Sequence, residues 1–219
     1  MSNNATDRRA TVQRIFHATC LRGVAWTLAA VPCAWPALSG AAFGEVVESP
    51  TPQFTSGGEL KRPTDYREWV FLTAGLDMSY SSEQSPDHHA FDNVLVNPRA
   101  YRSFLKTGTW PDGTILLIET RAGASKGSIN KRGSFQTTEV MGLEAHVKDS
   151  RRFKGSWAFF SFDSASTAKM IPQSEPCYAC HAAHAAVDTT FVQFYPTLLD
   201  TAKARGTLSA DYLRESSSQ

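Results

Sequence analysis

Residues 177–181 read Cys-Tyr-Ala-Cys-His, and they are the residues of this chain best suited to chemistry. The spacing C-x-x-C-H is the attachment motif of c-type haem. Two thiols three positions apart reach the two vinyl groups along one edge of a porphyrin, and the adjacent His181 is then held against the iron as its proximal ligand. The motif therefore predicts one haem c per chain, attached covalently through Cys177 and Cys180, with His181 as the metal ligand.

Two other interpretations of the motif stay open at this point. His184 extends it to C-x-x-C-H-x-x-H, which contains four potential ligands for a structural zinc ion, although zinc sites usually separate the cysteine and histidine pairs by a dozen or more residues. A C-x-x-C pair alone also fits a dithiol or a disulfide. Neither of these needs a histidine directly after the second cysteine, so the haem interpretation is favoured.

The N-terminus has the pattern of an export signal. Residues 1–22 carry four arginines against one aspartate, residues 23–38 are uncharged and mostly apolar, and residues 39–42 are small. A basic, an apolar and a small-residue region in this order predict a secretory signal peptide over residues 1–42, cleaved near Ala41 or Ala42. The apolar run holds two prolines and is short for a membrane span, but an uncleaved anchor is the alternative. We therefore expect a periplasmic protein.

Cleavage would leave a chain that suits haem attachment. Cys20 and Cys33 depart with the signal, so Cys177 and Cys180 are the only cysteines that remain. The formal charge moves from +1 to −2, because 18 basic residues then face 20 acidic ones. Nucleic-acid binding normally requires a clustered basic surplus, so we expect no nucleic-acid partner.

The mature chain has the length of one ordinary domain. We expect a flexible leader over residues 43–65, a haem-binding domain over 66–208 and a disordered tail over 209–219. Apolar, β-branched and alternating runs predict five strands. They cover residues 69–73, 94–96, 114–120, 143–148 and 157–162, and the last is apolar on both faces, which predicts a central, buried strand.

Helix signals accompany the strands. Asn97 and Pro98 are typical of a helix start and Gly108 of a helix end, while Pro196 and Gly206 bracket a second helix. Residues 182–186 are alanine-rich and predict a short helical turn beneath the haem. Together these elements predict an α+β fold, a mainly antiparallel β-sheet with a few flanking helices in a single haem-binding domain.

Long segments of the chain resemble cytochrome P-460 and its relative cytochrome c′-β. The resemblance spans residues 66–206 and is carried by YREWV (66–70), NPRAYRSFLKTGTWPDGT (97–114), GLEAHVKDSRRF (142–153), WAFFSF (157–162) and the segment 177–198 that contains the haem motif. It implies a mainly antiparallel β fold, a homodimer, a haem with an open or weakly capped axial site, and a periplasmic location.

The chain departs from the cytochrome P-460 pattern at one position. In cytochrome P-460 a lysine in the strand after the Pro-Asp-Gly turn is bonded covalently to the porphyrin, and the matching position here is Ile118, which has no amine. Lys106 and Lys126 are the nearest lysines. The departure favours the cytochrome c′-β branch, whose apolar distal pocket binds small neutral gases. Leu116 shares a strand face with Ile118, and Phe91 is a second candidate for capping the pocket.

Other residues are candidates by type for a sixth ligand or for proton transfer. Among the histidines, His146 is expected to point outward into solvent, and His184 lies one helical turn from His181 on the same side of the haem. The remaining candidates for the sixth ligand are His88, His89, Met78, Met141 and Met170. The candidates for proton transfer are Glu119, Glu139 and Glu144.

Three functions follow from these features. The first is a mono-haem cytochrome that binds or handles nitric oxide or a similar diatomic such as CO. The second is a haem-dependent oxidoreductase acting on hydroxylamine or nitric oxide, and whether the protein is an enzyme stays open. The third is an electron-transfer cytochrome, which would need two strong axial ligands and a soluble redox partner protein.

Overall fold

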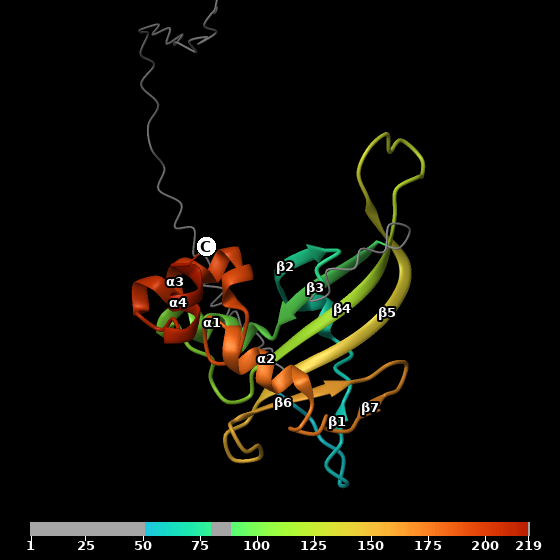
Figure 1. Ribbon diagram of the computed structural model, residues 1–219. Helices are drawn as coiled ribbons and strands as arrows, with labels where there is room; N and C mark the ends of the chain where they lie inside the picture. Colours follow the sequence, from blue (N-terminus) through green and yellow to red (C-terminus); the bar gives the residue numbers. More distant parts are fainter. Residues whose placement is uncertain (1–50, 80–88, 219) are drawn as a thin grey trace, which may run out of the picture. The chain divides into compact units, whose positions relative to one another are not determined.

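The centre of the fold is a five-stranded antiparallel sheet (Figure 1). A computed structural model describes residues 51–79 and 89–218. The sheet runs in chain order, β2-β3-β4-β5-β6, as a meander of neighbouring strands. Its strands are β2 (Val70–Leu76), β3 (Ala90–Val96), β4 (Ile115–Ala124), β5 (Phe135–Lys148) and β6 (Trp157–Ser161).

Helices and a small second sheet complete the α+β fold. A two-stranded sheet pairs β1 (Leu60–Lys61) with β7 (Thr167–Ala168). The helices are α1 (Pro98–Thr107), α2 (Pro176–His184), α3 (Pro196–Arg205) and α4 (Ala210–Ser216), with short 3₁₀ turns η1 (Tyr66–Glu68) and η2 (Val192–Phe194). Among residues 51–79 and 89–218, no helix is long and apolar enough to cross a membrane.

The helix boundaries follow from local sequence. Proline opens α1 and α3, where a missing N–H costs nothing, and both helices end at a glycine in the left-handed region, Gly108 (φ 73°) and Gly206 (φ 66°). The two helices predicted from these signals are therefore confirmed. The fold class predicted from the strand pattern is confirmed as well.

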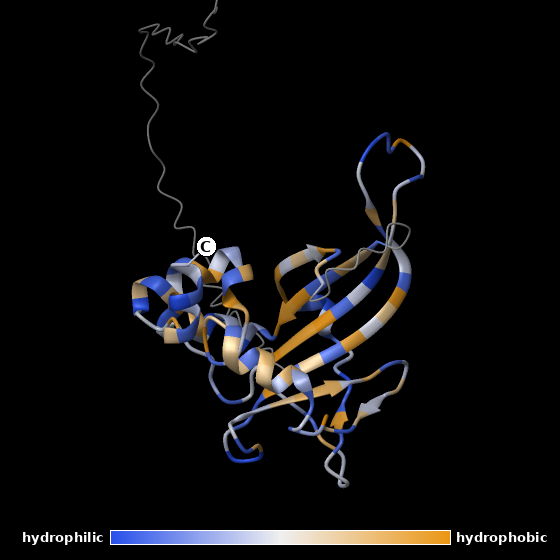
Figure 2. Ribbon diagram, in the orientation of Figure 1, coloured by the Kyte–Doolittle hydropathy of each residue, from blue (hydrophilic) through white to orange (hydrophobic). Residues whose placement is uncertain are grey.

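Each face of the sheet has its own apolar core. Figure 2 shows the hydrophobic residues of the strands in orange. Leu116 packs on one face with Trp157 and with the segment that follows α2, including Ala186 and Val187. Leu117 packs on the opposite face in a cluster with Ile115, Leu60 and Phe160. The period of two in β4 thus divides its apolar residues between the two cores.

Several expectations about the fold need correction. The strand at residues 157–162 is buried, but β6 lies at the edge of the sheet rather than in its centre, because α2 and the segment around Met170 cover it. Residues 43–65, expected as a flexible leader, include β1 with a fully buried Leu60. Residues 209–219, expected as a disordered tail, include α4. The predicted signal peptide lies outside the described residues.

Candidate functional site

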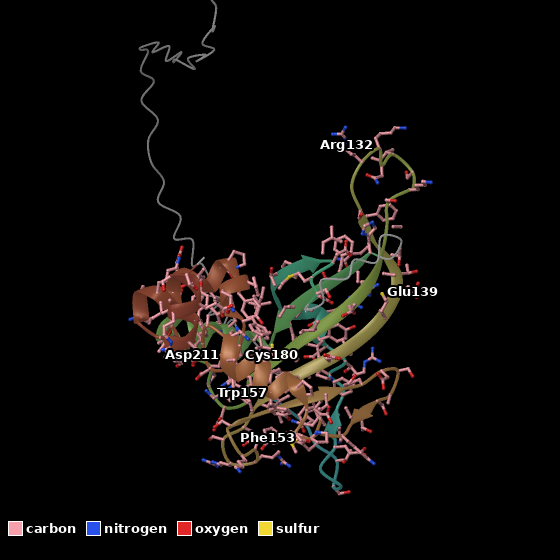
Figure 3. The ribbon with its side chains drawn as sticks, viewed as in Figure 1. Arg132, Glu139, Phe153, Trp157, Cys180 and Asp211 are labelled. Carbon is pink, nitrogen blue, oxygen red and sulfur yellow. The ribbon has the colours of Figure 1, made fainter. Side chains whose placement is uncertain are left out.

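The C-x-x-C-H motif lies on α2. The helix begins at Pro176, so Cys177, Cys180 and His181 are all helical, and the predicted turn at residues 182–186 is the end of this longer helix. Side chains three positions apart lie on one side of a helix, which places both thiols along the same edge. Both are free and half-buried. Figure 3 shows Cys180 on α2, far from Glu139 and Arg132 on the β4–β5 hairpin.

Tyr178, inside the motif, fixes α2 to the edge of the sheet. Its hydroxyl donates a hydrogen bond to the Ile171 carbonyl at 2.9 Å and accepts one from the Phe159 N–H at 3.2 Å. Its ring also meets the Phe159 ring edge-on, with centroids 4.8 Å apart. An edge strand has backbone groups without a neighbouring strand, and here a side chain of the motif satisfies one of them.

His181 is oriented by a backbone carbonyl. Its Nδ1 lies 2.8 Å from the carbonyl oxygen of Thr189, and because a carbonyl only accepts, Nδ1 carries the proton. The Nε2 lone pair is then free for a metal. Burial lowers the pKa of His181, and the hydrogen bond to Thr189 offsets only part of that effect. The imidazole is therefore kept in the neutral form that ligates a metal.

Aromatic rings surround the His181 imidazole. Its ring centroid lies 4.3 Å from that of Phe191, 4.7 Å from that of Phe159 and 5.1 Å from that of His146. These contacts restrict how the ring can turn about its χ angles. Together with the Thr189 carbonyl, they preorganise the ligand.

The expectation for His146 was wrong. The alternation that turns Leu143, Ala145 and Val147 to one face is present, but the other face of β5 is also covered at this point, so His146 is buried. Its ring stacks on Phe159 at 3.9 Å, and its Nε2 has no hydrogen-bond partner among the described residues. Burial, with a further contribution from His181, lowers the pKa of His146 well below its usual value.

Two of the three predicted distal residues share a face with His146. Leu116 pairs with His146 and Ile118 with Glu144 across β4 and β5, so all four side chains lie on the face that α2 covers. Leu116 is buried and Ile118 is half-buried. Phe91 pairs with Arg121 and lies three residues before Val94, the partner of Ile118. It is therefore on the opposite face, and the structure does not bring it to Ile118.

The three candidate carboxylates have different surroundings. Glu144 is on the site face. Burial raises the pKa of the Cys177 thiol, and the nearby Glu144 carboxylate raises it further. Desolvation, followed by the carboxylates of Asp92 and Asp163, raises the pKa of Glu144. Glu139 is exposed.

Glu119 is on the opposite face and is fully engaged there. It accepts hydrogen bonds from Tyr66 (2.5 Å), Arg67 and Arg121. Burial alone would raise the pKa of Glu119, but these donors lower it below its ordinary value. This carboxylate ties η1 to β4 and is not a candidate for proton transfer at α2.

The candidates for a sixth ligand are placed elsewhere. His184 pairs with Glu215 at 3.0 Å and His89 with Asp77 at 2.7 Å. The three methionines are exposed, as are Lys106 on α1 and Lys126 on the hairpin. His88 lies outside the described residues.

The residues at α2 fit a haem c group. They provide two reduced thiols on one helix edge and one neutral imidazole with a free Nε2. In the described part of the chain, no three His, Cys, Asp or Glu side chains converge to hold a metal ion, and His184 is turned to Glu215. The zinc interpretation therefore lacks its ligand set.

A comparison with protein families agrees with this geometry. The family model described as Cytochrome P460 matches residues 63–192, more than half of the 219 residues. The chain belongs to the cytochrome P460 family. The match includes the five main strands and α2, and membership identifies a cytochrome with a haem cofactor. A search of curated proteins found no match.

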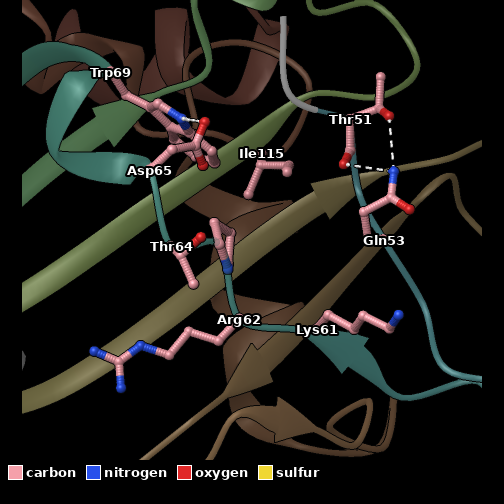
Figure 4. Close-up of a pocket in the computed structure, with 9 residues that line it drawn as sticks. Thr51, Gln53, Lys61, Arg62, Thr64, Asp65, Trp69 and Ile115 are labelled. Atoms are coloured by element: carbon pink, nitrogen blue, oxygen red, sulfur yellow. Dashed lines mark hydrogen bonds between the residues drawn. The ribbon is translucent and has the colours of Figure 1, made fainter.

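In this cytochrome P460 family member, a surface pocket lies apart from the motif on α2. A pocket of about 220 Å³ is lined by residues around β1 and η1, including Lys61, Arg62, Asp65, Trp69 and Ile115 (Figure 4). Its walls contain none of the motif residues. The candidate haem site is therefore α2 with the sheet face that it covers.

Proposed function

We propose that this member of the cytochrome P460 family is an exported, periplasmic mono-haem c-type cytochrome whose open axial position binds nitric oxide or a similar small diatomic. The observation that carries the proposal is the Nδ1–H of His181 donating to the Thr189 carbonyl, which leaves Nε2 free as an oriented ligand. Cys177 and Cys180 would hold the porphyrin through thioether bonds, and the bound iron would supply a vacant coordination position.

The sheet face beside α2 supports a preference for neutral gases. Leu116 and Ile118 contribute no hydrogen-bond donor to this face, on which His146 packs beside His181 and Glu144 is exposed. Bound O₂ carries partial negative charge and depends on such a donor, whereas NO and CO depend on it less. Ile118 in place of an amine is also consistent with a porphyrin that has no third bond to the protein.

Five-coordination is favoured over electron transfer between two strong axial ligands. Within residues 51–79 and 89–218, each histidine other than His181 is either committed to a carboxylate or packed beside His181, and each methionine is exposed. Electron transfer through a soluble partner protein remains the function that a six-coordinate spectrum would favour.

Glu144 favours one second candidate, oxidation of hydroxylamine or nitric oxide. This carboxylate shares a face with Ile118, and burial with the nearby carboxylates of Asp92 and Asp163 raises its pKa, which favours the protonated form that can donate a proton. Turnover of hydroxylamine with an artificial electron acceptor tests this function. Glu144→Gln should abolish the turnover while Glu139→Gln, an exposed carboxylate on the same strand, leaves it intact; no turnover by the wild type would contradict the enzyme function.

Absorption spectra of exported protein test the leading proposal. We expect oxidised and reduced spectra of a five-coordinate haem, with adducts after addition of CO and NO. Mass spectrometry should show one haem per chain, lost in the Cys177→Ser/Cys180→Ser variant. A six-coordinate reduced spectrum without a CO or NO adduct would overturn the proposal.

A substitution at Ile118 then tests the pocket wall. Ile118→Phe adds volume on the site face and should slow CO binding by about tenfold or more, because it narrows access to the iron. Leu95→Phe is the matched control, since Leu95 is half-buried on the opposite face of the sheet. Equal CO rates in the two variants would remove Ile118 from the pocket.

Assembly as a homodimer is part of the proposal. The edge strand β2 exposes Phe71 and Leu76, 55% and 47% accessible, which a second copy would cover. Sedimentation of the mature protein should give a dimer, and Phe71→Asp/Leu76→Asp should give a monomer.

N-terminal sequencing of the exported chain should locate cleavage of the proposed signal peptide near Ala41 or Ala42.

A further inference from the structure

The turn that orients His181 is itself held by an ion pair. We propose that Lys148 and Asp188 are positioning residues for the proximal ligand: they fix the Thr189 carbonyl and thereby set the strength of the bond between His181 and the haem iron. This inference rests on the proposed haem attachment and goes beyond it, since neither residue belongs to the motif.

The turn needs such support because its backbone is strained. Val187 and Thr190 close it with reciprocal hydrogen bonds of 2.7 and 3.3 Å. The two residues between them, Asp188 (φ 51°) and Thr189 (φ 58°), both lie in the left-handed region. This region is uncommon for residues other than glycine and least favourable for β-branched ones such as threonine. Strain of this kind persists only where surrounding contacts over-determine it.

Those contacts come from β5 and from the turn before β4. The Lys148 ammonium donates to Asp188 Oδ2 at 2.9 Å and to the Trp110 carbonyl at 2.8 Å. The Trp110 backbone N–H donates to the same Asp188 oxygen at 3.3 Å, and its indole N–H donates to Thr190 Oγ1 at 2.8 Å. Asp188 and Thr190, on either side of Thr189, are therefore both attached to one buried tryptophan, and Asp188 is attached to Lys148 as well.

The ion pair is shielded from water more than is usual at a surface. The side chains of Lys148 and Asp188 are 16% and 31% exposed. The Lys203–Asp200 pair on α3, at 3.3 Å, has side chains that are 55% and 89% exposed. Attraction between charges is weakly screened where water is excluded, so the first pair is suited to hold a backbone and the second is not.

The effect on the ligand follows from the hydrogen bond at Nδ1. A well-placed acceptor makes the imidazole a stronger donor to iron, which strengthens the iron–nitrogen bond and favours the ferric state. If the ion pair is removed, the Thr189 carbonyl is less well fixed and the bond at Nδ1 lengthens. His181 then becomes a weaker ligand.

The experiment uses the exported, haem-loaded protein. Asp188→Asn keeps a side chain that tolerates positive φ while removing the charge, and Lys148→Met removes the ammonium. Resonance Raman of the reduced protein should show the iron–histidine stretch at lower frequency in both variants. In both, the ferric–ferrous equilibrium should shift toward ferrous by about tenfold, which is 59 mV for one electron. Asp200→Asn and Lys203→Met are the matched controls and should match the wild type.

The charge changes of the two variants are opposite, and this separates positioning from electrostatics. A through-space field effect would shift the potential in opposite directions and leave the iron–histidine stretch unchanged, and that result would overturn the inference. An unchanged stretch in both variants would overturn it as well. A wild-type protein without covalent haem would instead contradict the proposed function.

Trp110→Phe gives an independent test if either charge variant fails to fold. It removes the indole N–H that holds Thr190 and leaves the Lys148–Asp188 pair in place. We expect a smaller shift of the iron–histidine stretch in the same direction. A variant with wild-type circular dichroism, full haem content and an unshifted stretch would overturn the inference.

Discussion

His146 lies beside His181, with ring centroids 5.1 Å apart and ring planes at 81°. His146 also stacks on Phe159, and its Nε2 is buried without a hydrogen-bond partner among the described residues. The His146 ring therefore contributes to stability through packing, and its Nε2 adds no hydrogen bond.

The first prediction follows from that packing. His146→Phe keeps an aromatic ring against His181 and removes the unpartnered nitrogen, so the free energy of unfolding should change by less than about 1 kcal/mol. His146→Ala leaves a cavity and should cost about 2–4 kcal/mol. Urea unfolding of the haem-loaded variants measures both. Equal losses for the two substitutions would show that the nitrogen has a partner after all.

The two histidines of α2 should behave differently. His181→Ala removes the ligand and should change the absorption spectrum of the covalently attached haem. His184→Ala removes an exposed contact with Glu215, so the spectrum should match that of the wild type. If both substitutions altered the spectrum equally, His184 would also be a ligand of the iron.

The carboxylate of Glu119 should be important for stability but not for the haem. Glu119→Gln removes the charge that Tyr66, Arg67 and Arg121 surround, and we expect a loss of about 2–4 kcal/mol in the free energy of unfolding. Haem content and spectrum should be unchanged, because Glu119 faces away from α2. The exposed Glu139→Gln is the control and should lie within about 0.5 kcal/mol of the wild type.

The same residue predicts a dependence on pH. The pKa of Glu119 is lower in the folded protein than in the unfolded chain, where it is about 4.3. Its contribution is therefore complete above that unfolded value and is lost as the pH falls from there through the lower folded pKa. Unfolding measured between pH 7 and about pH 3 should show the difference between wild type and Glu119→Gln shrinking toward acid. A constant difference would mean that Glu119 is not ionised in the folded protein.

Helix α4 should stabilise α2. Ser209 caps α4 by accepting the Tyr212 N–H at 3.1 Å, and its hydroxyl donates to the Ala185 carbonyl, just after α2, at 2.8 Å. Ser209→Ala should therefore cost about 1–2 kcal/mol of stability. Ser216→Ala, at the exposed end of the same helix, is the control. Thermal unfolding would contradict the prediction if the two midpoints coincided.

Local signals explain how much of this was predictable from sequence. The motif at residues 177–181 has a fixed spacing, the prolines and glycines bracket α1 and α3, and the alternation in β4 places Leu116 and Ile118 on one face; each depends only on neighbours in the chain. Some errors concern where structure forms, since β1 and α4 lie in segments expected to lack it, and Phe91 lies on the opposite face from Ile118. Two others concern what covers a surface. His146 was expected in solvent because β5 alternates, and β6 was expected in the centre because it is apolar on both faces. In each case, a helix from later in the chain provides the cover.

Thr189, Tyr178 and Phe191 were missed for a related reason. A carbonyl acceptor leaves no trace in residue type, and a tyrosine between two cysteines is one of many residues that the motif accepts. The turn that carries the Thr189 carbonyl was not predicted either. Its two central residues, Asp188 and Thr189, both have positive φ but include no glycine, the residue that usually marks such a turn in a sequence.

Two of the contacts that orient His181, with the Thr189 carbonyl and with the Phe191 ring, are made by residues that follow it in the chain. If the chain is exported N-terminus first, as proposed, Cys177 and Cys180 emerge before Thr189 and Phe191 do. The two thiols would then be accessible for haem attachment before the His181 imidazole is held in its final orientation.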